Sequence, residues 1–339
     1  MRKSIWNRQI RQKVWATLLG ALGLVLLLTG CRTSQPRMYR VGIICGSEFF
    51  LPVVEGFKAK MAEYGYVEGK NITYTIPAPD PRPAEQRRMA EEFVASGVDL
   101  ILAVPSEPAI EAKQVTQGID IPVVFAYAGI EDGSLITDSR QPGGNITGVR
   151  FPGPEQIAKR LEILVEIVPQ ARRVWIGYQR DYPNTEPALA ALRPLASSLN
   201  VTLVEVPALT VEELRADLAA RAAAEDIGID AIILMPDILN HSPEGWAEIK
   251  TFAREHKVPI GGSFLYTVEE GALFGNCNDL FKVGELAAVP ADKILRGTPA
   301  GTIPVLTPND ELYVNLRVAQ DLGIQIPDHL LAQAVQVVR

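Results

Sequence analysis

The sequence reads Asp99-Leu-Ile-Leu-Ala-Val-Pro105 in its first half and Asp230-Ala-Ile-Ile-Leu-Met-Pro236 in its second. A continuous apolar run of this length is typical of a strand buried on both faces, as in a parallel sheet covered by helices. Each stretch is followed at a similar distance by a second apolar run, Ile121-Pro-Val-Val124 or Val258-Pro-Ile-Gly261. The repeated order predicts two lobes of like construction.

Short β-rich runs alternate with amphipathic stretches over most of the chain. The predicted strands are 40–45, 72–76, 99–104 and 121–125, with a turn and short strand at 142–149, and then 173–177, 201–206, 230–235 and 258–261. The predicted helices are 51–64, 84–96, 108–117, 186–199, 211–225 and 244–256. This alternation predicts an α/β protein with two Rossmann-like doubly wound parallel-sheet lobes joined by crossover strands.

The lobes are expected to divide the chain unevenly. Residues 39–147 form the first predicted lobe and residues 148–263 the second. The remaining segment, 264–339, holds too few predicted strands for a third copy of the pattern. We therefore expect it to cross back and complete both lobes.

The start of the chain differs from the rest. A basic stretch precedes an apolar run from Ala16 to Leu28, and Leu28-Thr-Gly-Cys31 follows at once. This order predicts a secretory signal peptide over 1–30, because the run is too short to span a bilayer comfortably. The cysteine resembles that of a bacterial lipobox, so we expect lipid on Cys31 to hold the mature chain at the membrane through a tether, 31–38. A transmembrane anchor with a chance cysteine is the alternative.

Charge and cysteine content restrict the partners and the covalent framework. The formal net charge is −7, and it becomes −12 without the five basic residues of the predicted signal. An acidic mature chain argues against a nucleic-acid partner. Besides Cys31 the only cysteines are Cys45 and Cys277, so no disulfide framework is indicated. We expect two buried free thiols, with a single bridge between them as the alternative.

The sequence contains few features that indicate an enzyme. Its three histidines are scattered without metal-ligand spacing, and no P-loop, dinucleotide fingerprint, nucleophile elbow or zinc motif is present. We therefore predict no catalytic residue, no cofactor and no metal. Composition alone leaves a paired-carboxylate hydrolase open.

Ligand contacts are expected where strands end. In open parallel sheets ligands bind beyond the carboxyl ends of the strands, where loops lead into helix N-termini. Two facing lobes would make a cleft from these loops. The candidates are Ser47, Glu48, Phe49, Ser106, Glu107 and Tyr127 in the first lobe and Tyr178, Asn184, Thr185, Asp237, Ser263 and Phe264 in the second.

Each candidate also has a structural alternative. Asn184 and Asp237 are residue types that cap helices, and Glu48 is typical of a solvent-facing charge at a helix start. The aromatic candidates could belong to the core. We expect at least two of them to line the cleft and stack on a planar or apolar ligand.

Several short motifs of the sequence resemble those of a known family. They are Gly65-Tyr-Val-Glu-Gly-Lys-Asn71, Val98-Asp-Leu-Ile101, Ile121-Pro-Val-Val-Phe125, Pro142-Gly-Gly-Asn-Ile-Thr-Gly148, Lys293-Ile-Leu-Arg-Gly297, Asn315-Leu and Leu322-Gly-Ile-Gln-Ile-Pro327. In this order they are similar to the ABC-transporter substrate-binding proteins whose better-known members carry tryptophan or tyrosine. The resemblance covers nearly the whole mature chain and implies the type I periplasmic-binding fold. It also implies ligand contacts at Ser106, Asn184, Thr185, Asp237 and Asp279.

The departures from the family pattern fall mainly in the expected pocket. Glu48 and Phe49 stand where a histidine and a proline are usual, and the Asp-Pro pair expected after Phe125 is missing. The acidic Glu48 suggests a more cationic or polyhydroxylated ligand. The resemblance otherwise implies an aromatic or other amino acid, with Asp237 accepting the ammonium group.

The function implied is binding without chemistry. A monomeric lipoprotein outside the cytoplasm, in the periplasm or on the outer face of the cell membrane, would close its lobes on a small molecule. It would then deliver the molecule to an ABC permease with its ATPase. A ligand-sensing lipoprotein that feeds a signalling receptor would use the same binding physics and is the alternative.

Overall fold

The computed structural model describes residues 37–80 and 82–339. The predicted signal peptide, the predicted lipidation site Cys31 and most of the predicted tether lie outside these residues. Tyr39–Arg339 form one compact unit. The fold described below is that of this unit.

The first lobe is built on a parallel sheet of five strands. Its order is β2-β1-β3-β4-β5, and the register pairs Val41 of β1 with Leu100 of β3. The strands are β1 Tyr39–Cys45, β2 Ile72–Thr75, β3 Leu100–Val104, β4 Val123–Ala128 and β5 Ile146–Arg150. The helices of this lobe are α2 Leu51–Glu63, α3 Pro83–Ser96, α4 Ser106–Val115 and α11 Leu280–Leu295, with the short turns η1 Glu48–Phe50 and η2 Ala300–Thr302.

The second lobe is built on a sheet of seven strands. Its order is β12-β11-β10-β9-β8-β6-β7, and only the pairing of β10 with β11 is antiparallel. The strands are β6 Arg173–Gln179, β7 Thr202–Ala208, β8 Ala231–Ile233, β9 Ile260–Gly262, β10 Phe274–Cys277, β11 Glu311–Asn315 and β12 Ala334–Val338. The helices are α5 Gly153–Ile167, α6 Thr185–Ser198, α7 Val211–Ala222, α8 Ile238–His241, α9 Pro243–His256, α10 Leu265–Glu270, α12 Leu316–Leu322 and α13 Asp328–Gln333.

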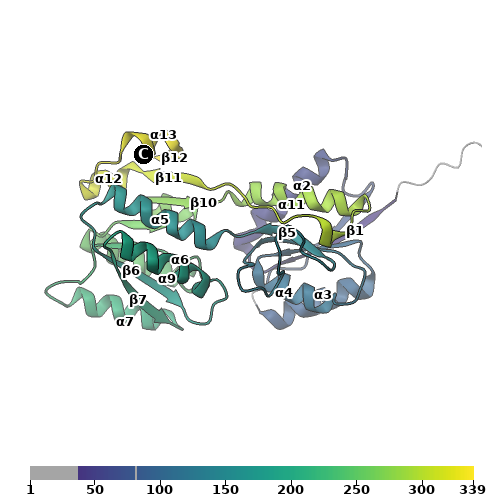
Figure 1. Cartoon of the computed structure of the whole chain (residues 1–339), viewed down its shortest axis with the longest axis horizontal. Coiled ribbons are helices and arrows are strands. Elements are labelled where there is room, and N and C mark those ends of the chain that lie inside the picture. The colour runs from purple at the N-terminus through teal and green to yellow at the C-terminus, as the bar shows by residue number, and fades with distance from the viewer. Residues whose placement is uncertain (1–36, 81) are drawn as a thin grey trace, which may run out of the picture. The chain divides into compact units, whose positions relative to one another are not determined.

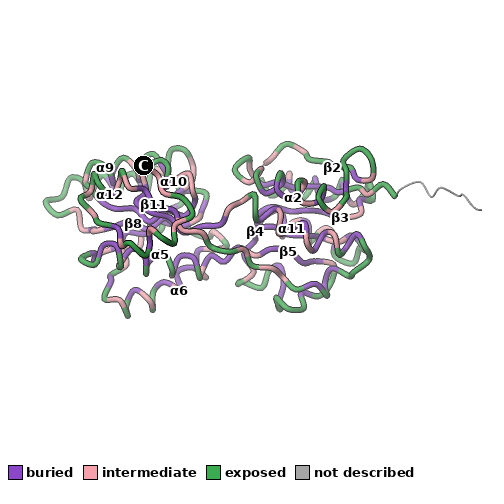
Figure 2. Tube along the Cα trace, turned by 90° about the horizontal axis from the view of Figure 1, so that it is seen from above, coloured by how far each residue is buried: buried purple, intermediate pink, exposed green. Residues whose placement is uncertain are grey.

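The two sheets confirm the predicted α/β class with two parallel-sheet lobes. Every residue of β3 is buried, as its unbroken apolar sequence indicates. In each lobe buried side chains pack on both faces of the sheet. Figure 2 shows this burial along the strands, with exposed residues on the outer helices and loops. Cys45 and Cys277 are both buried and free, as expected.

The chain crosses between the lobes three times. The first crossing, 151–152, joins β5 to α5, and the second, 278–279, joins β10 to α11. The third, 307–310, runs from Leu306, which pairs with Val149 of β5, into β11. The expected boundary at 147/148 therefore falls inside β5, and 264–277 stay in the second lobe before the chain crosses back.

Helix α11 returns to the first lobe and packs against α2 (Figure 1). Two glycines allow the close approach. A Cβ atom on Gly56 would lie 1.9 Å from the carbonyl oxygen of Phe281, and one on Gly284 would lie 2.0 Å from that of Val53. The absence of side chains at these positions lets the two backbones touch, which fixes the second and third crossings relative to the first lobe.

Replacing Gly284 with alanine should lower the free energy of unfolding by about 1–3 kcal/mol, because the new methyl group overlaps the backbone of α2. Urea unfolding measures the change. Glu285→Ala, at the next position of α11, is the control and should leave the midpoint near that of the parent. Equal midpoints for Gly284→Ala and the parent would contradict the close packing.

Candidate functional site

Four strands end at one cavity. Gly46 follows β1, Pro105 follows β3, Asp237 lies four residues beyond β8, and Phe264 lies two beyond β9. Their carboxyl ends meet because β1 runs parallel to β3 in one sheet and β8 runs parallel to β9 in the other. The cavity measures about 670 Å³, within the range of small-molecule sites. Its lining residues are Gly46, Ser47, Phe49, Phe50, Gln86, Pro105, Glu107, Tyr182, Pro236, Asp237, Ile238, His241, Ser242, Pro243, Trp246, Ala247, Lys250, Phe264, Tyr266 and Glu270.

Aromatic rings form one wall of the cavity. Phe264 and Tyr266 lie nearly parallel, with centroids 6.4 Å apart and an interplanar angle of 12°. Phe49 reaches them from the first lobe, with its ring centroid 4.7 Å from that of Phe264 and 5.8 Å from that of Tyr266. Trp246 of α9 meets Tyr266 edge to face at 6.4 Å. This surface is suited to stacking on a flat or apolar group.

His241 also lines the cavity and is hydrogen-bonded to this wall. Its Nδ1 lies 2.5 Å from the hydroxyl oxygen of Tyr266, and its Nε2 lies 2.6 Å from Oγ of Ser263. Burial, with a smaller contribution from the Arg160 charge, lowers the pKa of His241 to about 3. The ring is therefore neutral at physiological pH and holds Tyr266 through a fixed hydrogen bond.

Asp237 places a carboxyl group in the cavity. It is the N-cap of α8, where it accepts hydrogen bonds from the backbone N–H of Asn240 at 2.8 Å and of Gln179 at 3.0 Å. The side-chain amide of Asn240 donates a further bond at 2.8 Å. Burial outweighs these bonds and raises the pKa of Asp237 to about 6. At neutral pH the group is an anion in a largely apolar cavity.

Two contacts join the lobes across the cleft. The carboxyl group of Glu107, at the start of α4, is hydrogen-bonded to the hydroxyl of Tyr182 in the second lobe. Burial raises the pKa of Glu107. Asn184 lies against Gly129 of the first lobe, where a Cβ atom would be 2.1 Å from its Oδ1. Side chains from both lobes therefore bound the cavity.

The charged rim of the cavity is an ion pair in the second lobe. Nζ of Lys250 donates to Oε2 of Glu270 at 2.6 Å and lies 5.5 Å from the ring centroid of Trp246. Nε1 of Trp246 donates to the same carboxylate oxygen at 2.8 Å. The charge of Glu270 thus neutralises that of Lys250. The lining is acidic because it also contains the carboxyl groups of Asp237 and Glu107.

The structure brings together only some of the predicted site residues. Ser47, Phe49, Glu107 and Asp237 line the cavity, and so does Phe264. The predicted residues that do not line it are Glu48, Ser106, Tyr127, Tyr178, Asn184, Thr185, Ser263 and Asp279.

Most of the others have partners inside the protein. Oγ of Ser106 accepts from the backbone N–H of Gly129 at 3.0 Å, and Oγ1 of Thr185 donates to the carbonyl of Gln179 at 3.1 Å. The hydroxyl of Tyr178 donates to Glu205 at 3.4 Å. Asp279 caps α11 by accepting from the backbone N–H groups of Phe281 and Lys282.

Two predicted residues differ from these. Tyr127 is buried in the core beside Phe151, and its hydroxyl has no hydrogen-bond partner among the described residues. Glu48 lies on the exposed turn η1. Neither position brings the side chain to the cavity.

Sequence reasoning missed several lining residues: Phe50, Gln86, Tyr182, Pro236, Ile238, His241, Ser242, Pro243, Trp246, Ala247, Lys250, Tyr266 and Glu270. Many come from α8 and the first turns of α9. A signal for these two helices was present, because Asp237 and Ser242 are both N-cap residue types and both cap helices in the structure. Two caps five residues apart indicate a short extra helix, which carries His241 into the cavity.

Residues 37–80 and 82–339 contain neither a cluster of metal ligands nor a helix suited to span a membrane. No group of three or more His, Cys, Asp and Glu side chains in these ranges is arranged to hold a metal ion. None of the helices in the same part of the chain has the length and apolar character needed to span a membrane.

Comparison with known proteins gives a consistent result. Residues 41–338 match the model of the family described as "ABC transporter substrate binding protein". A protein of Clostridioides difficile (strain R20291) named tyrosine-binding protein is 27% identical over 326 residues, which cover 91% of each chain. The family description is that of a solute-binding protein and not of an enzyme.

Solved structures share the fold at low identity. A conserved domain protein from Vibrio cholerae has a TM-score of 0.77 at 24% identity and covers 89% of this chain and 99% of its own. A Streptococcus pneumoniae domain in complex with L-Trp has a TM-score of 0.77 at 22% identity, with 89% and 100% covered. The ligand-free, open form of a Clostridium difficile substrate-binding protein with adhesive properties has a TM-score of 0.71 at 23% identity, with 89% and 99% covered.

The low pKa of His241 predicts how this residue affects stability. Between pH 3 and 6.5 the unfolded chain binds a proton that the folded chain excludes, so the contribution of His241 to the free energy of unfolding rises with pH. His241→Asn should therefore be costlier at pH 7 than at pH 4. Urea unfolding of the variant and the parent at both pH values measures this, and a cost independent of pH would contradict a neutral, buried ring.

Proposed function

Since the chain belongs to the family of ABC transporter substrate-binding proteins, we propose that it captures a small amine-bearing molecule between its lobes for an ABC importer. An amino acid with an aromatic or apolar side chain is the first candidate. The observation that carries this proposal is the cavity itself, where the strand-terminal loops of both lobes surround an aromatic wall and a buried carboxyl group.

The lining favours a ligand that combines a cation with an apolar body. Asp237 offers a carboxylate to an ammonium group, and Glu107 adds acidic character from the opposite lobe. Phe264, Tyr266 and Trp246 offer ring faces and edges to the rest of the ligand. The names of two relatives, a tyrosine-binding protein and a domain in complex with L-Trp, support an aromatic amino acid.

A ligand carboxylate would meet backbone donors. Helix α4 begins at Ser106 beside the cavity, and the first N–H groups of a helix have no partners within it. The hydroxyl of Ser47, which does not cap the turn that follows it, is a second donor at the edge of β1. Lys250, the one lysine or arginine among the described residues that line the cavity, is already paired with Glu270.

Capture is coupled to lobe closure in this proposal. The lobes open about the three crossings, a ligand enters, and contacts from both sides favour the closed form. The closed form is the shape that a permease with its ATPase receives. A monomer suffices, because both halves of the cavity come from one chain. We further propose that the protein works outside the cytoplasm, with lipid on Cys31.

Replacing Asp237 with alanine should abolish the thermal stabilisation by any amino acid that stabilises the parent, because the ammonium group loses its carboxylate partner. In the parent, a ligand at a hundred times its dissociation constant adds about 2.7 kcal/mol of stability. Differential scanning fluorimetry measures the shift. Thr210→Ala, which removes the side chain that caps α7 away from the cavity and the crossings, is the control. A shift in Asp237→Ala equal to that of the parent would place the pocket elsewhere.

The affinity for an amine should depend on pH through Asp237. Because its pKa lies at about 6, the carboxyl group is protonated below that pH and the ion pair is lost. The dissociation constant should rise about tenfold for each pH unit below 6 and level off above it. Titration calorimetry from pH 4.5 to 8 tests this. Asp237→Asn should bind weakly at every pH, and a pH dependence in that variant equal to the parent's would assign the titration to another group.

A further inference from the structure

We propose that Gln156 is a positioning residue for ligand capture, whose side-chain amide holds the three interlobe crossings in the arrangement that closes the cavity. The inference rests on the proposed function, because it concerns lobes that close on a ligand. Gln156 lies in the first turn of α5, directly after the first crossing (Figure 1). Its side chain is only 1% exposed.

One nitrogen of Gln156 reaches both of the other crossings. Nε2 donates to Oδ1 of Asn278, in the second crossing, at 2.7 Å. It also donates to Oδ1 of Asp310, at the end of the third crossing, at 2.7 Å. The bond to the carboxylate is charge-assisted and therefore the stronger of the two. A single side chain thus links all three passages of the chain between the lobes.

Neighbouring amides complete this hinge network, defined as Gln156, Asn276, Asn278 and Asp310. Nδ2 of Asn278 donates to the carbonyl of Asn309 at 2.7 Å and to Oδ1 of Asp310 at 3.1 Å. Nδ2 of Asn276 donates to the carbonyl of Gln156 at 3.1 Å. The side chains of Asn276 and Asn278 are also buried. Buried polar groups of this kind are costly when their partners move away.

Arg160, one turn further along α5, extends the connection to the cavity. Its guanidinium donates through Nη1 to the carbonyl of Leu234 at 2.9 Å and through Nη2 to that of Asn276 at 3.0 Å. Leu234 directly precedes the loop that carries Pro236 and Asp237 into the cavity. Residues four apart share one face of a helix, so the same face of α5 holds both the hinge and the binding loop.

The network biases the equilibrium between open and closed lobes. Opening displaces the crossings relative to one another, and Gln156 is bonded to two of them. A variant that weakens these bonds reduces the closed population, so the apparent dissociation constant rises by the same factor for every ligand. A residue that touches the ligand would instead change the affinities of different ligands unequally.

The test replaces the donor with an acceptor. Gln156→Glu brings a second carboxylate against Asp310 and against Oδ1 of Asn278, and we expect the lobes of the ligand-free protein to separate. Small-angle scattering should show a larger radius of gyration than that of the parent. Titration calorimetry with two amino acids should show both dissociation constants raised by the same factor of about ten. Gln156→Ala should change both quantities in the same direction.

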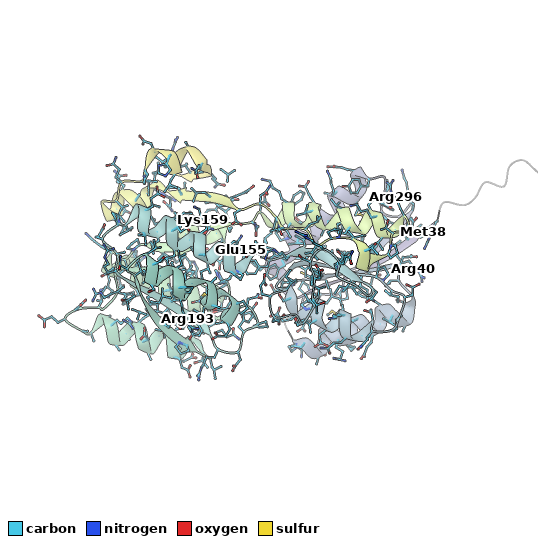
Figure 3. All side chains as sticks on the ribbon, viewed as in Figure 1. Met38, Arg40, Glu155, Lys159, Arg193 and Arg296 are labelled. Carbon is cyan, nitrogen blue, oxygen red and sulfur yellow. The ribbon has the colours of Figure 1, made fainter. Side chains whose placement is uncertain are left out.

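A second substitution should reverse the effect. Adding Asp310→Asn to Gln156→Glu restores an amide donor opposite the introduced carboxylate, so the radius and both dissociation constants should return toward the parent values. A merely structural role would lower the urea midpoint without this recovery. Lys159→Gln is the matched control, because Lys159 lies on the exposed side of the same helix (Figure 3) and pairs only with Glu162 among the described residues.

Each outcome decides the proposal. An unchanged ligand-free radius in Gln156→Glu overturns it, and this measurement needs no ligand. A changed ratio of the two dissociation constants also overturns it, because Gln156 would then act on the pocket. Failure of every amine to bind the parent would refute the proposed ligand class and leave the scattering result to decide the role of Gln156.

Discussion

The parallel direction of the strands is the constraint on which the rest of this structure depends. Throughout the first sheet, and from β7 to β10 in the second, neighbouring strands run parallel, so their carboxyl ends lie at one edge and loops follow them there. The three crossings join the sheets so that both edges border one cavity. The close packing of α11 on α2 through Gly56 and Gly284 then fixes where the returning chain can cross.

Burial has different consequences at the cavity and at the hinge. A buried polar group is tolerated where hydrogen bonds replace its contacts with water. At the hinge, the side-chain amides of Gln156 and Asn278 and the carboxylate of Asp310 are hydrogen-bonded to one another, so the network is sensitive to any displacement. At the cavity, Asp237 accepts bonds from its own lobe and still carries a pKa raised by burial. A cationic ligand held between the lobes would supply the positive charge that Asp237 lacks. Binding of the ligand and closure of the lobes would then favour each other.

The fold was predictable because buried strands and amphipathic helices leave strong local patterns. The repeated Asp-apolar-Pro stretches indicated both lobes, and the strand ends indicated Ser47, Phe49, Glu107 and Asp237, which line the cavity in the structure. The remaining parts of the cavity and the hinge leave weaker signals in the sequence. The short helix α8 escapes periodicity analysis because it spans one turn, which hid His241. Tyr266 and Trp246 reach the cavity through tertiary packing, which single-sequence patterns do not contain. The hinge amides belong to segments distant in sequence, and only the topology brings them together.

Hydrogen exchange with and without a bound amino acid tests the central claim most directly, namely that loops from both lobes enclose the ligand. The account predicts slower exchange in the strand-terminal segments of the first lobe, 46–51 and 105–108, together with 236–247 and 263–270 of the second. Protection confined to one lobe, with the other unchanged at saturating ligand, would contradict it.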